Sequence, residues 1–422
     1  MRKNSFRKIA IAGTIILIVV LLSSALMATT TITFWTMSLK PKFTNFITSI
    51  VNGYEKTHPD VKVIWEDIPW NVEQQKLLGA IASGQVPDVV NLNADWTLDF
   101  ARRGALLPFN DLLPSNVIND YFASMLKATS INGKMYSLPW YVAPDVTFYN
   151  RKLFEKAGLD PNQPPKTWDE AIIDSIIIKD RTGTYGMMPT ILQSSTPPLF
   201  FYGLPLLSPD GKKAIFNEPE YVHILTKWAT LYKLGYLPKN IIEGGAWTKS
   251  TELYGSGQLA MLITGPQFAD RVKVNSPDIY EESDVAPVPL GESKIFGAAI
   301  QDLVIVKGTK HPKVAADFAA YVTNAENEIA FDKLVTIFPT RKSALKDPFF
   351  SKYDGTLPTK VRITAAKELN HVSYVIYNIP NPHELFQTLN DAISAAFLGV
   401  KTPQQALNDA AKAWDEALAG ND

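Results

Sequence analysis

Apolar and polar residues alternate along the chain with two different periods. Beyond residue 28, short β-rich runs of period two are separated by stretches in which apolar residues recur every three or four positions. Phe43, Ile47, Ile50 and Tyr54, for example, lie on one face of a helix. The pattern predicts strands at 31–35, 61–65 and 87–90, and helices at 43–54, around 77–81 and at 96–103. This βαβαβ order predicts a parallel sheet with right-handed crossovers.

The same alternation continues to the C-terminus. Asn132-Gly133 is a type I′ hairpin signal, and Thr167 with Glu170 forms a capping-box signal at a helix start. Further strands are predicted at 146–149, 185–188 and 259–263, and further helices at 153–157, 221–234, 382–398 and 402–418. No internal repeat or low-complexity tract interrupts this α/β pattern.

The first 28 residues form a separate segment. Arg2, Lys3, Arg7 and Lys8 precede the apolar run 9–22, and small residues follow it up to Ala28. This layout is typical of a secretory signal peptide, because the run is short for a membrane span of about 20 residues. Cleavage could follow Ala25 or Ala28. The alternative is an uncleaved N-terminal anchor helix.

Composition narrows the possible chemistry. The 422 residues include no cysteine, which excludes disulfides, a thiolate nucleophile, thiolate metal sites and a lipidated N-terminal cysteine. The formal net charge is −1, and removal of the basic leader leaves a mildly acidic body. A nucleic-acid-binding protein needs a basic face, so we expect no nucleic-acid partner.

The sequence contains no recognisable catalytic motif. Gly255-Ser-Gly257-Gln-Leu-Ala260 matches the loose dinucleotide pattern, but a helix precedes it and a strand follows it, the reverse of the required order. We therefore interpret it as a turn. The five histidines lack metal-ligand spacing, so no metal site and no cofactor are expected. A pair of carboxylates distant in sequence could still serve a glycosidase, which keeps a secreted glycan-acting hydrolase as an alternative.

Aromatic residues stand beside turn residues at predicted strand ends. In open α/β sheets, ligands bind outside the carboxyl ends of the strands. An aromatic ring there can stack on the apolar face of a sugar, while neighbouring amides and carboxylates pair with its hydroxyls. Trp65, Trp168 and Trp228 fit core positions instead. The candidates at strand ends are Trp35, Trp96, Trp140, Tyr141, Tyr374 and Tyr377.

Several motifs resemble family 1 extracellular solute-binding proteins, the maltose-binding-like receptors of ABC sugar importers. They occur in the family's order over nearly the whole chain after the leader. The motifs are Ala82-Ser-Gly-Gln-Val-Pro-Asp-Val-Val90, Gly104-Ala-Leu-Leu-Pro108, Gly133-Lys-Met-Tyr-Ser-Leu-Pro139, Phe148-Tyr-Asn150 through Gly158, Pro165-Lys-Thr-Trp168-Asp-Glu170, Gly257-Gln-Leu-Ala-Met261 with Gly265-Pro266, Ala286-Pro-Val-Pro289 and Phe338-Pro-Thr-Arg341.

This resemblance implies a two-lobed α/β fold of the type II periplasmic-binding-protein class, with hinge-linked lobes whose central sheets are flanked by helices. Residues 1–28 would be the signal peptide or anchor. Residues 29–142 and 299–339 would form the first lobe, and residues 143–298 and 340–422 the second. The ligand site would lie between the lobes.

The resemblance also implies site residues. Asp95 falls where the maltose receptor places a hydroxyl-binding Asp, and Asn93 and Trp96 flank it. That receptor has a stacking Trp after the Gly-Pro of its second lobe, whereas here Gln267 follows Gly265-Pro266. Gln267 would then bind a hydroxyl, and Trp140 or Tyr141 could supply the missing platform. Ala143 also replaces the hinge-proximal Glu, so maltose itself is in doubt.

These observations predict an extracytoplasmic receptor that captures a saccharide between its lobes and delivers it to the membrane permease of an ABC importer. We expect a monomer in the periplasm or an equivalent compartment, without a lipid anchor because there is no cysteine. A receptor for a non-sugar solute, such as a polyol phosphate or a peptide, is the nearer alternative, and the hydrolase is the more distant one.

Overall fold

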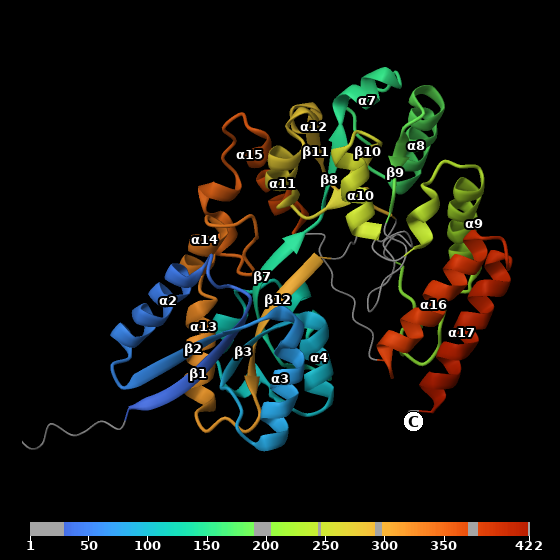
Figure 1. Ribbon diagram of the computed structural model, residues 1–422. Coiled ribbons are helices and arrows are strands. Elements are labelled where there is room, and N and C mark those ends of the chain that lie inside the picture. Colours follow the sequence, from blue (N-terminus) through green and yellow to red (C-terminus); the bar gives the residue numbers. More distant parts are fainter. Residues whose placement is uncertain (1–28, 190–203, 244–245, 292–297, 370–378, 421–422) are drawn as a thin grey trace, which may run out of the picture.

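The computed structural model describes residues 29–189, 204–243, 246–291, 298–369 and 379–420. It has two α/β lobes, each with a sheet flanked by helices (Figure 1). The strands are β1 (Thr30–Met37), β2 (Val61–Ile68), β3 (Val89–Asn93), β4 (Leu106–Leu107), β5 (Ser130–Ile131), β6 (Lys134–Met135), β7 (Leu138–Pro144), β8 (Val146–Asn150), β9 (Tyr185–Met187), β10 (Leu259–Thr264), β11 (Ser283–Ala286) and β12 (Ala298–Val306).

The helices connect and cover these strands. They are α2 (Thr44–Thr57), α3 (Trp70–Ser83), α4 (Ala94–Arg102), α5 (Ser115–Ile118), α6 (Ala123–Ala128), α7 (Arg151–Lys156), α8 (Trp168–Thr182), α9 (Pro219–Lys233), α10 (Ala246–Gly255), α11 (Phe268–Asn275), α12 (Pro277–Glu282), α13 (Pro312–Val322), α14 (Ala325–Asp332), α15 (Leu357–Glu368), α16 (Pro382–Phe397) and α17 (Pro403–Ala419). Short 3-10 helices lie at Phe109–Asp111, Lys239–Ile242, Ala344–Lys346 and Pro348–Phe350.

The first lobe is built on a six-stranded sheet. Its order is β2-β1-β3-β12-β4, with β7 also paired to β12. β1 pairs in parallel with both β2 and β3, which confirms the predicted βαβαβ unit. β12 runs antiparallel to β3, β4 and β7, so the sheet is mixed. β12 lies about 200 residues after β3 in the chain, and the local periodicity of the sequence gave no sign that the two strands pair.

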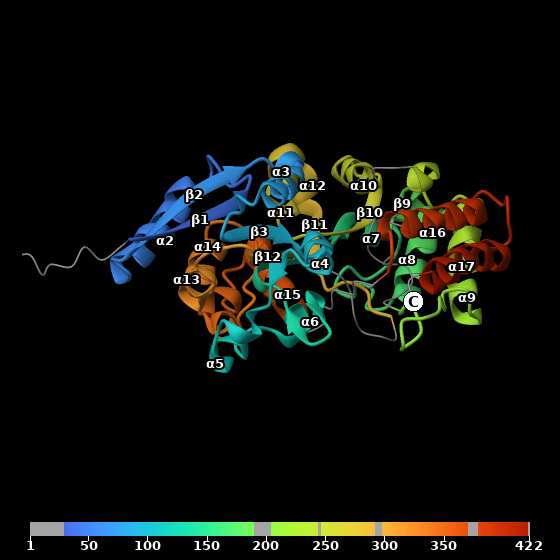
Figure 2. The ribbon, with the colours of Figure 1, turned by 90° about the horizontal axis from the view of Figure 1, so that it is seen from below.

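The second lobe is built on a four-stranded sheet of order β11-β8-β10-β9. β10 pairs in parallel with β9 and antiparallel to β8. The glycine pattern at 255–260 is a turn between α10 and β10, as predicted, and Gly257 has φ 71°. Viewed from below, α9, α16 and α17 lie at the opposite end of the molecule from β1, β2 and α2 (Figure 2).

Two local signals in the sequence are confirmed in detail. Asn132 and Gly133 have φ 51° and 76° and join β5 to β6, as a type I′ turn requires. The Thr167 hydroxyl accepts a hydrogen bond from the Glu170 amide at 3.2 Å, and the Glu170 carboxylate accepts one from the Thr167 amide. This capping box begins α8, whose buried Trp168 packs edge-to-face on Trp228 with ring centroids 6.0 Å apart.

The chain passes between the lobes at more than one place. Asp145 alone separates β7 of the first sheet from β8 of the second, and the segment after β11 returns to β12. Beside the first crossing, the backbones of Val142 and Phe338 exchange two hydrogen bonds, of 3.0 and 2.9 Å. The lobe boundaries at 142/143, 298/299 and 339/340 stay a prediction.

Candidate ligand-binding site

Strand topology decides which sheet edges face each other. β7 leads directly into β8, so the carboxyl end of β7 points toward the second sheet. β12 is antiparallel to both β7 and β3, and β3 is parallel to β1 and β2 through the pairing of β1. The carboxyl ends of β1, β2 and β3 therefore face the second lobe. The carboxyl end of β10 faces the first lobe, because Thr264 pairs with Val146 at the start of β8.

The loop after β1 is held rigidly against the end of β2. The Asp67 carboxylate accepts hydrogen bonds from the Thr36 hydroxyl at 2.7 Å and from the amides of Leu39 and Lys40, each at 2.9 Å. The Ser38 hydroxyl accepts a hydrogen bond from the Trp70 amide at 2.9 Å. These bonds fix the backbone before α3 at the edge that faces the second lobe.

The carboxyl end of β3 brings together three residues expected in the site. The Asn93 side-chain oxygen accepts a hydrogen bond from the Trp96 amide at 2.8 Å and so caps α4. Asp95 and Trp96 are half-buried in the first turn of this helix. The expected roles of Asn93, Asp95 and Trp96 in ligand binding stay predictions, with the Asn93 oxygen already engaged in the cap.

Trp70 belongs to the same edge, although the sequence analysis did not single it out. Its side chain is 45% exposed, and its ring centroid lies 5.7 Å from that of Trp96. The signal that could have found it is Ile68-Pro69-Trp70, a tryptophan just after a strand end and a turn residue. The same signal drew attention to Trp140.

Trp35 and Trp140 are core residues in this structure. Trp35 is 7% exposed, and the Lys76 ammonium lies 4.2 Å from the centroid of its ring. Trp140 is 1% exposed and stacks on Phe331 with centroids 5.6 Å apart. Side chains alternate between the two faces of a strand, and both rings lie on faces that are packed in the core. Neither ring therefore has a face exposed to a ligand. The idea that Trp140 supplies a stacking platform is therefore corrected.

Tyr141 and Gln267 differ in exposure. Tyr141 is half-buried and packs edge-to-face on Phe331 with centroids 5.5 Å apart. Burial raises the pKa of its phenol well above the usual range. Gln267 is exposed just after β10, at the edge that faces the first lobe. Both stay candidates for hydroxyl pairing, while Tyr374 and Tyr377 lie outside the described residues.

Trp247 is a second aromatic residue that sequence reasoning missed. It lies in the first turn of α10 and is 43% exposed. Its indole nitrogen donates a hydrogen bond of 2.9 Å to the hydroxyl of Thr264, the last residue of β10. The sequence gave little sign of this position, because Trp247 starts a helix and reaches the strand end only through the fold.

Burial raises the pKa of two carboxyl groups, one at the first crossing between the lobes and one near the end of β3. Burial raises the pKa of Asp302 to about 7, against hydrogen bonds from Ser137 and Thr97 that lower it. Burial also raises the pKa of Asp145, between the two sheets, to about 7. A protonated carboxyl can donate as well as accept hydrogen bonds.

Among the described residues, no group of three or more His, Asp or Glu side chains could hold a metal ion.

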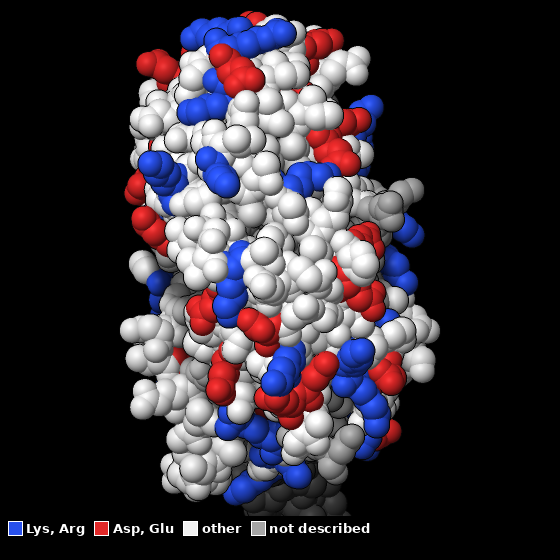
Figure 3. Space-filling model, turned by 90° about the vertical axis from the view of Figure 1, so that its right-hand side faces the viewer, with Lys and Arg blue, Asp and Glu red and all other residues white. Residues whose placement is uncertain are grey.

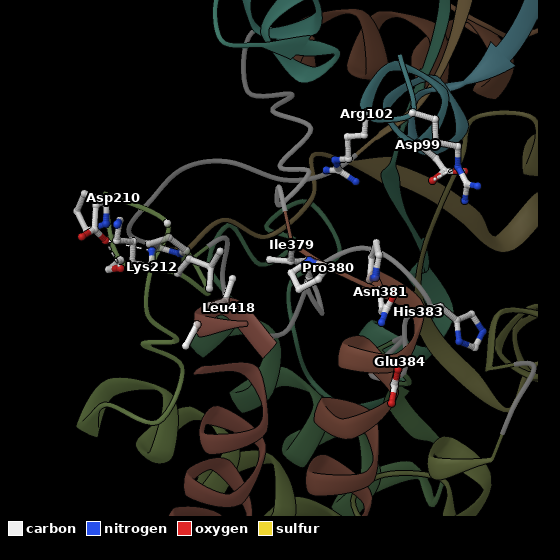
Figure 4. A pocket seen from close by; sticks show the side chains of 18 of the residues that line it. Asp99, Arg102, Asp210, Lys212, Ile379, Pro380, Asn381, His383, Glu384 and Leu418 are labelled. Atoms are coloured by element: carbon white, nitrogen blue, oxygen red, sulfur yellow. Dashed lines mark hydrogen bonds and ion pairs between the residues drawn. The ribbon is translucent and has the colours of Figure 1, made fainter. Parts of the chain in front are cut away.

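A cavity of about 1430 Å³ is lined by residues of both lobes (Figure 4). None of the strand-end residues described above lines it. Asp99 and Arg102 of α4 lie across it from Ile379–Glu384 of the second lobe (Figure 4). α4 thus has its first turn at the strand-end site and its last turn at the cavity. On the face of the molecule that lies to the right in Figure 1, Lys and Arg side chains are interspersed with Asp and Glu side chains (Figure 3).

The comparisons with known proteins agree with this architecture. The chain is 25% identical to the arabinooligosaccharide-binding protein of Halalkalibacterium halodurans, over 90% of this chain and 88% of that protein. It is 24% identical to the sn-glycerol-3-phosphate-binding periplasmic protein UgpB of Yersinia pseudotuberculosis, over 99% and 98%. The structure of the sugar-binding protein MalE from Xanthomonas citri superposes with a TM-score of 0.76 at 23% identity, covering 93% of this chain and 98% of that one.

In the part of the chain that the structure describes, none of the helices is both long and apolar enough to cross a membrane.

The family itself is established by the sequence. A family model described as bacterial extracellular solute-binding protein matches residues 40–329, which is more than half of the chain. The chain belongs to the bacterial extracellular solute-binding proteins.

Proposed function

We propose that the protein is the receptor of an ABC importer and binds a saccharide between its lobes. The observation that carries this proposal is the pair of facing strand edges, each with an exposed indole and polar side chains. Trp70 and Trp96 lie on the first lobe and Trp247 on the second. The polar side chains are those of Asn93, which caps the helix of Trp96, and of Gln267, which is exposed just after β10. An indole offers an apolar face to a sugar ring, and amides pair with hydroxyls.

The mechanism is binding followed by closure. A ligand that contacts both edges interacts more strongly with the closed form than with the open form, and only this difference can shift the equilibrium. The closed receptor would then dock on the permease subunits of the importer. The family consists of binding proteins, so the hydrolase alternative is not favoured. We further propose that the protein acts as a monomer outside the cytoplasm, exported by its leader.

The names of similar proteins support an oligosaccharide as the ligand. Relatives bind arabino-oligosaccharides and diacetylchitobiose, and a solved relative holds maltotetraose. UgpB, which binds sn-glycerol-3-phosphate, keeps a polyol phosphate as the competing ligand class.

Thermal unfolding with a ligand panel tests the proposal. The panel comprises maltotetraose, arabinotriose, diacetylchitobiose and sn-glycerol-3-phosphate. A saccharide at 1,000 times its Kd should stabilise the native state by about 4 kcal/mol. Stabilisation by the phosphate alone would overturn the saccharide assignment. An unchanged unfolding midpoint with every saccharide would also count against it, and calorimetric titration would check both results.

A further inference from the structure

Two tryptophan side chains of this protein are exposed to solvent. All nine Trp residues lie in the described part of the chain, and the two most exposed are Trp70 and Trp247, at 45% and 43%. Each lies at the carboxyl end of a strand, Trp70 after β2 and Trp247 beside β10. The strand pairings turn these two edges toward each other's lobe.

Trp247 is held in place on two sides. Its indole nitrogen donates to the Thr264 hydroxyl at 2.9 Å, and Thr264 itself is only 2% exposed. The Arg271 guanidinium of α11 lies 5.2 Å from the centroid of the indole ring. One edge of the ring is therefore bonded and one face is supported by a cation, while 43% of the side chain meets solvent.

The fold explains how a helix residue reaches the strand end. α10 ends at Gly255, and β10 begins four residues later at Leu259, so the helix and the strand run in opposite directions. The first turn of α10 consequently lies beside the last residue of β10. In Figure 2, α3 of the first lobe and α10 of the second lobe both lie along the upper edge of the molecule.

We propose that Trp247 is the sugar-stacking platform of the second lobe and that Thr264 is its positioning residue. This inference rests on the proposed function and deepens it. The residue after Gly265-Pro266, where a stacking tryptophan was expected from the family resemblance, is Gln267. Trp247 supplies the missing ring from another element. The ligand presents the C–H face of a pyranose or furanose ring to it.

A purely structural role fits these observations less well. A surface cation–π contact contributes about 0.5–1 kcal/mol and does not need a tryptophan that leaves nearly half its surface in water. Burying the ring would have gained more, as it does for Trp168 and Trp228. Because Thr264 and Arg271 already orient Trp247 before a ligand binds, less side-chain entropy is lost on binding.

Affinity measurements on point variants test the platform. The probe is the saccharide of the panel that binds the wild type most tightly, titrated by calorimetry. Trp247→Ala should weaken binding roughly tenfold or more, and Trp247→Phe, which keeps a ring face, should weaken it less. Thr264→Val should weaken binding roughly threefold to tenfold by releasing the indole. Tyr353→Ala, which removes a 57% exposed ring elsewhere, is the matched control and should change nothing.

A second readout separates contact from structure. N-bromosuccinimide oxidises exposed indoles, and peptide mass mapping locates the oxidised residue. The saccharide should protect Trp247 from oxidation. Wild-type binding with an unaltered Kd in Trp247→Ala, or oxidation of Trp247 unaffected by ligand, overturns the platform alone. Failure of every saccharide to bind the wild type overturns the proposed function, and the platform with it.

Discussion

Glu73 makes the stability of this protein depend on pH. It lies in the first turn of α3, its side chain is 0% exposed, and its carboxylate oxygens have no hydrogen-bond partner among the described residues. Burial raises the pKa of this carboxyl from 4.5 to about 8, with Asp67 raising it further and Lys76 lowering it. The native protein therefore holds this proton at neutral pH, whereas the unfolded chain releases it.

The sign and size of the effect follow from the two pKa values. Between 4.5 and about 8 the native state binds one proton more than the unfolded state, so stability falls as pH rises through this window. Each pH unit costs about 1.4 kcal/mol, so the rise from about pH 5.5 to about pH 7.5 removes roughly 2–3 kcal/mol. Glu73→Gln keeps the shape and cannot ionise. The free energy of unfolding of Glu73→Gln, relative to that of the wild type, should therefore rise by roughly 2–3 kcal/mol between about pH 5.5 and about pH 7.5.

Urea unfolding at both pH values measures this difference. Tryptophan fluorescence and circular dichroism should give coincident transitions, as a two-state analysis requires. Glu416→Gln is the control, because this side chain is 69% exposed and meets water in both states; its difference from the wild type should stay constant. A constant difference for Glu73→Gln as well would refute the reasoning, because it would mean that Glu73 does not hold its proton more tightly when folded.

Three further changes test other parts of the structure. Trp70→Ala should weaken binding of the same saccharide several-fold while the unfolding midpoint moves little, since this ring is 45% exposed; equal Kd values would remove Trp70 from the site. Thr167→Ala should cost about 1 kcal/mol in urea unfolding by removing the cap of α8, and Thr167→Ser should restore most of it. Trp414→Ala should cost about 3–5 kcal/mol, because this fully buried ring packs on Phe216 and Phe386, and a loss below 1 kcal/mol would contradict its place in the core.

Local structure was predictable where neighbouring residues carry the signal. The Asn132-Gly133 turn and the capping box at Thr167 were confirmed because each depends on contacts within a few residues. The first βαβαβ unit was confirmed because successive strands joined by a helix pair in parallel. The partnership of β12 with β3 and β7 was not visible in the periodicity, because it joins segments about 150–200 residues apart.

The candidate site shows the same division. Strand ends could be located from sequence, and Asn93, Asp95 and Trp96 do lie at one. Which face of a strand a ring occupies depends on packing, so Trp35 and Trp140 are in the core. Trp247 reaches the end of β10 from the start of a helix, and its bond to Thr264 reveals this.

By itself, the sequence determined the α/β class, the helix and strand succession and the family, because these depend on local periodicity and on ordered motifs. Only the tertiary structure decided which aromatic rings are available to a ligand. The faces of a ring are covered or left open by residues distant in the chain, as Phe331 covers Trp140 and as Thr264 and Arg271 orient Trp247 toward solvent. Burial of Glu73 is likewise a property of the folded protein. No pattern of neighbouring residues encodes these distant contacts.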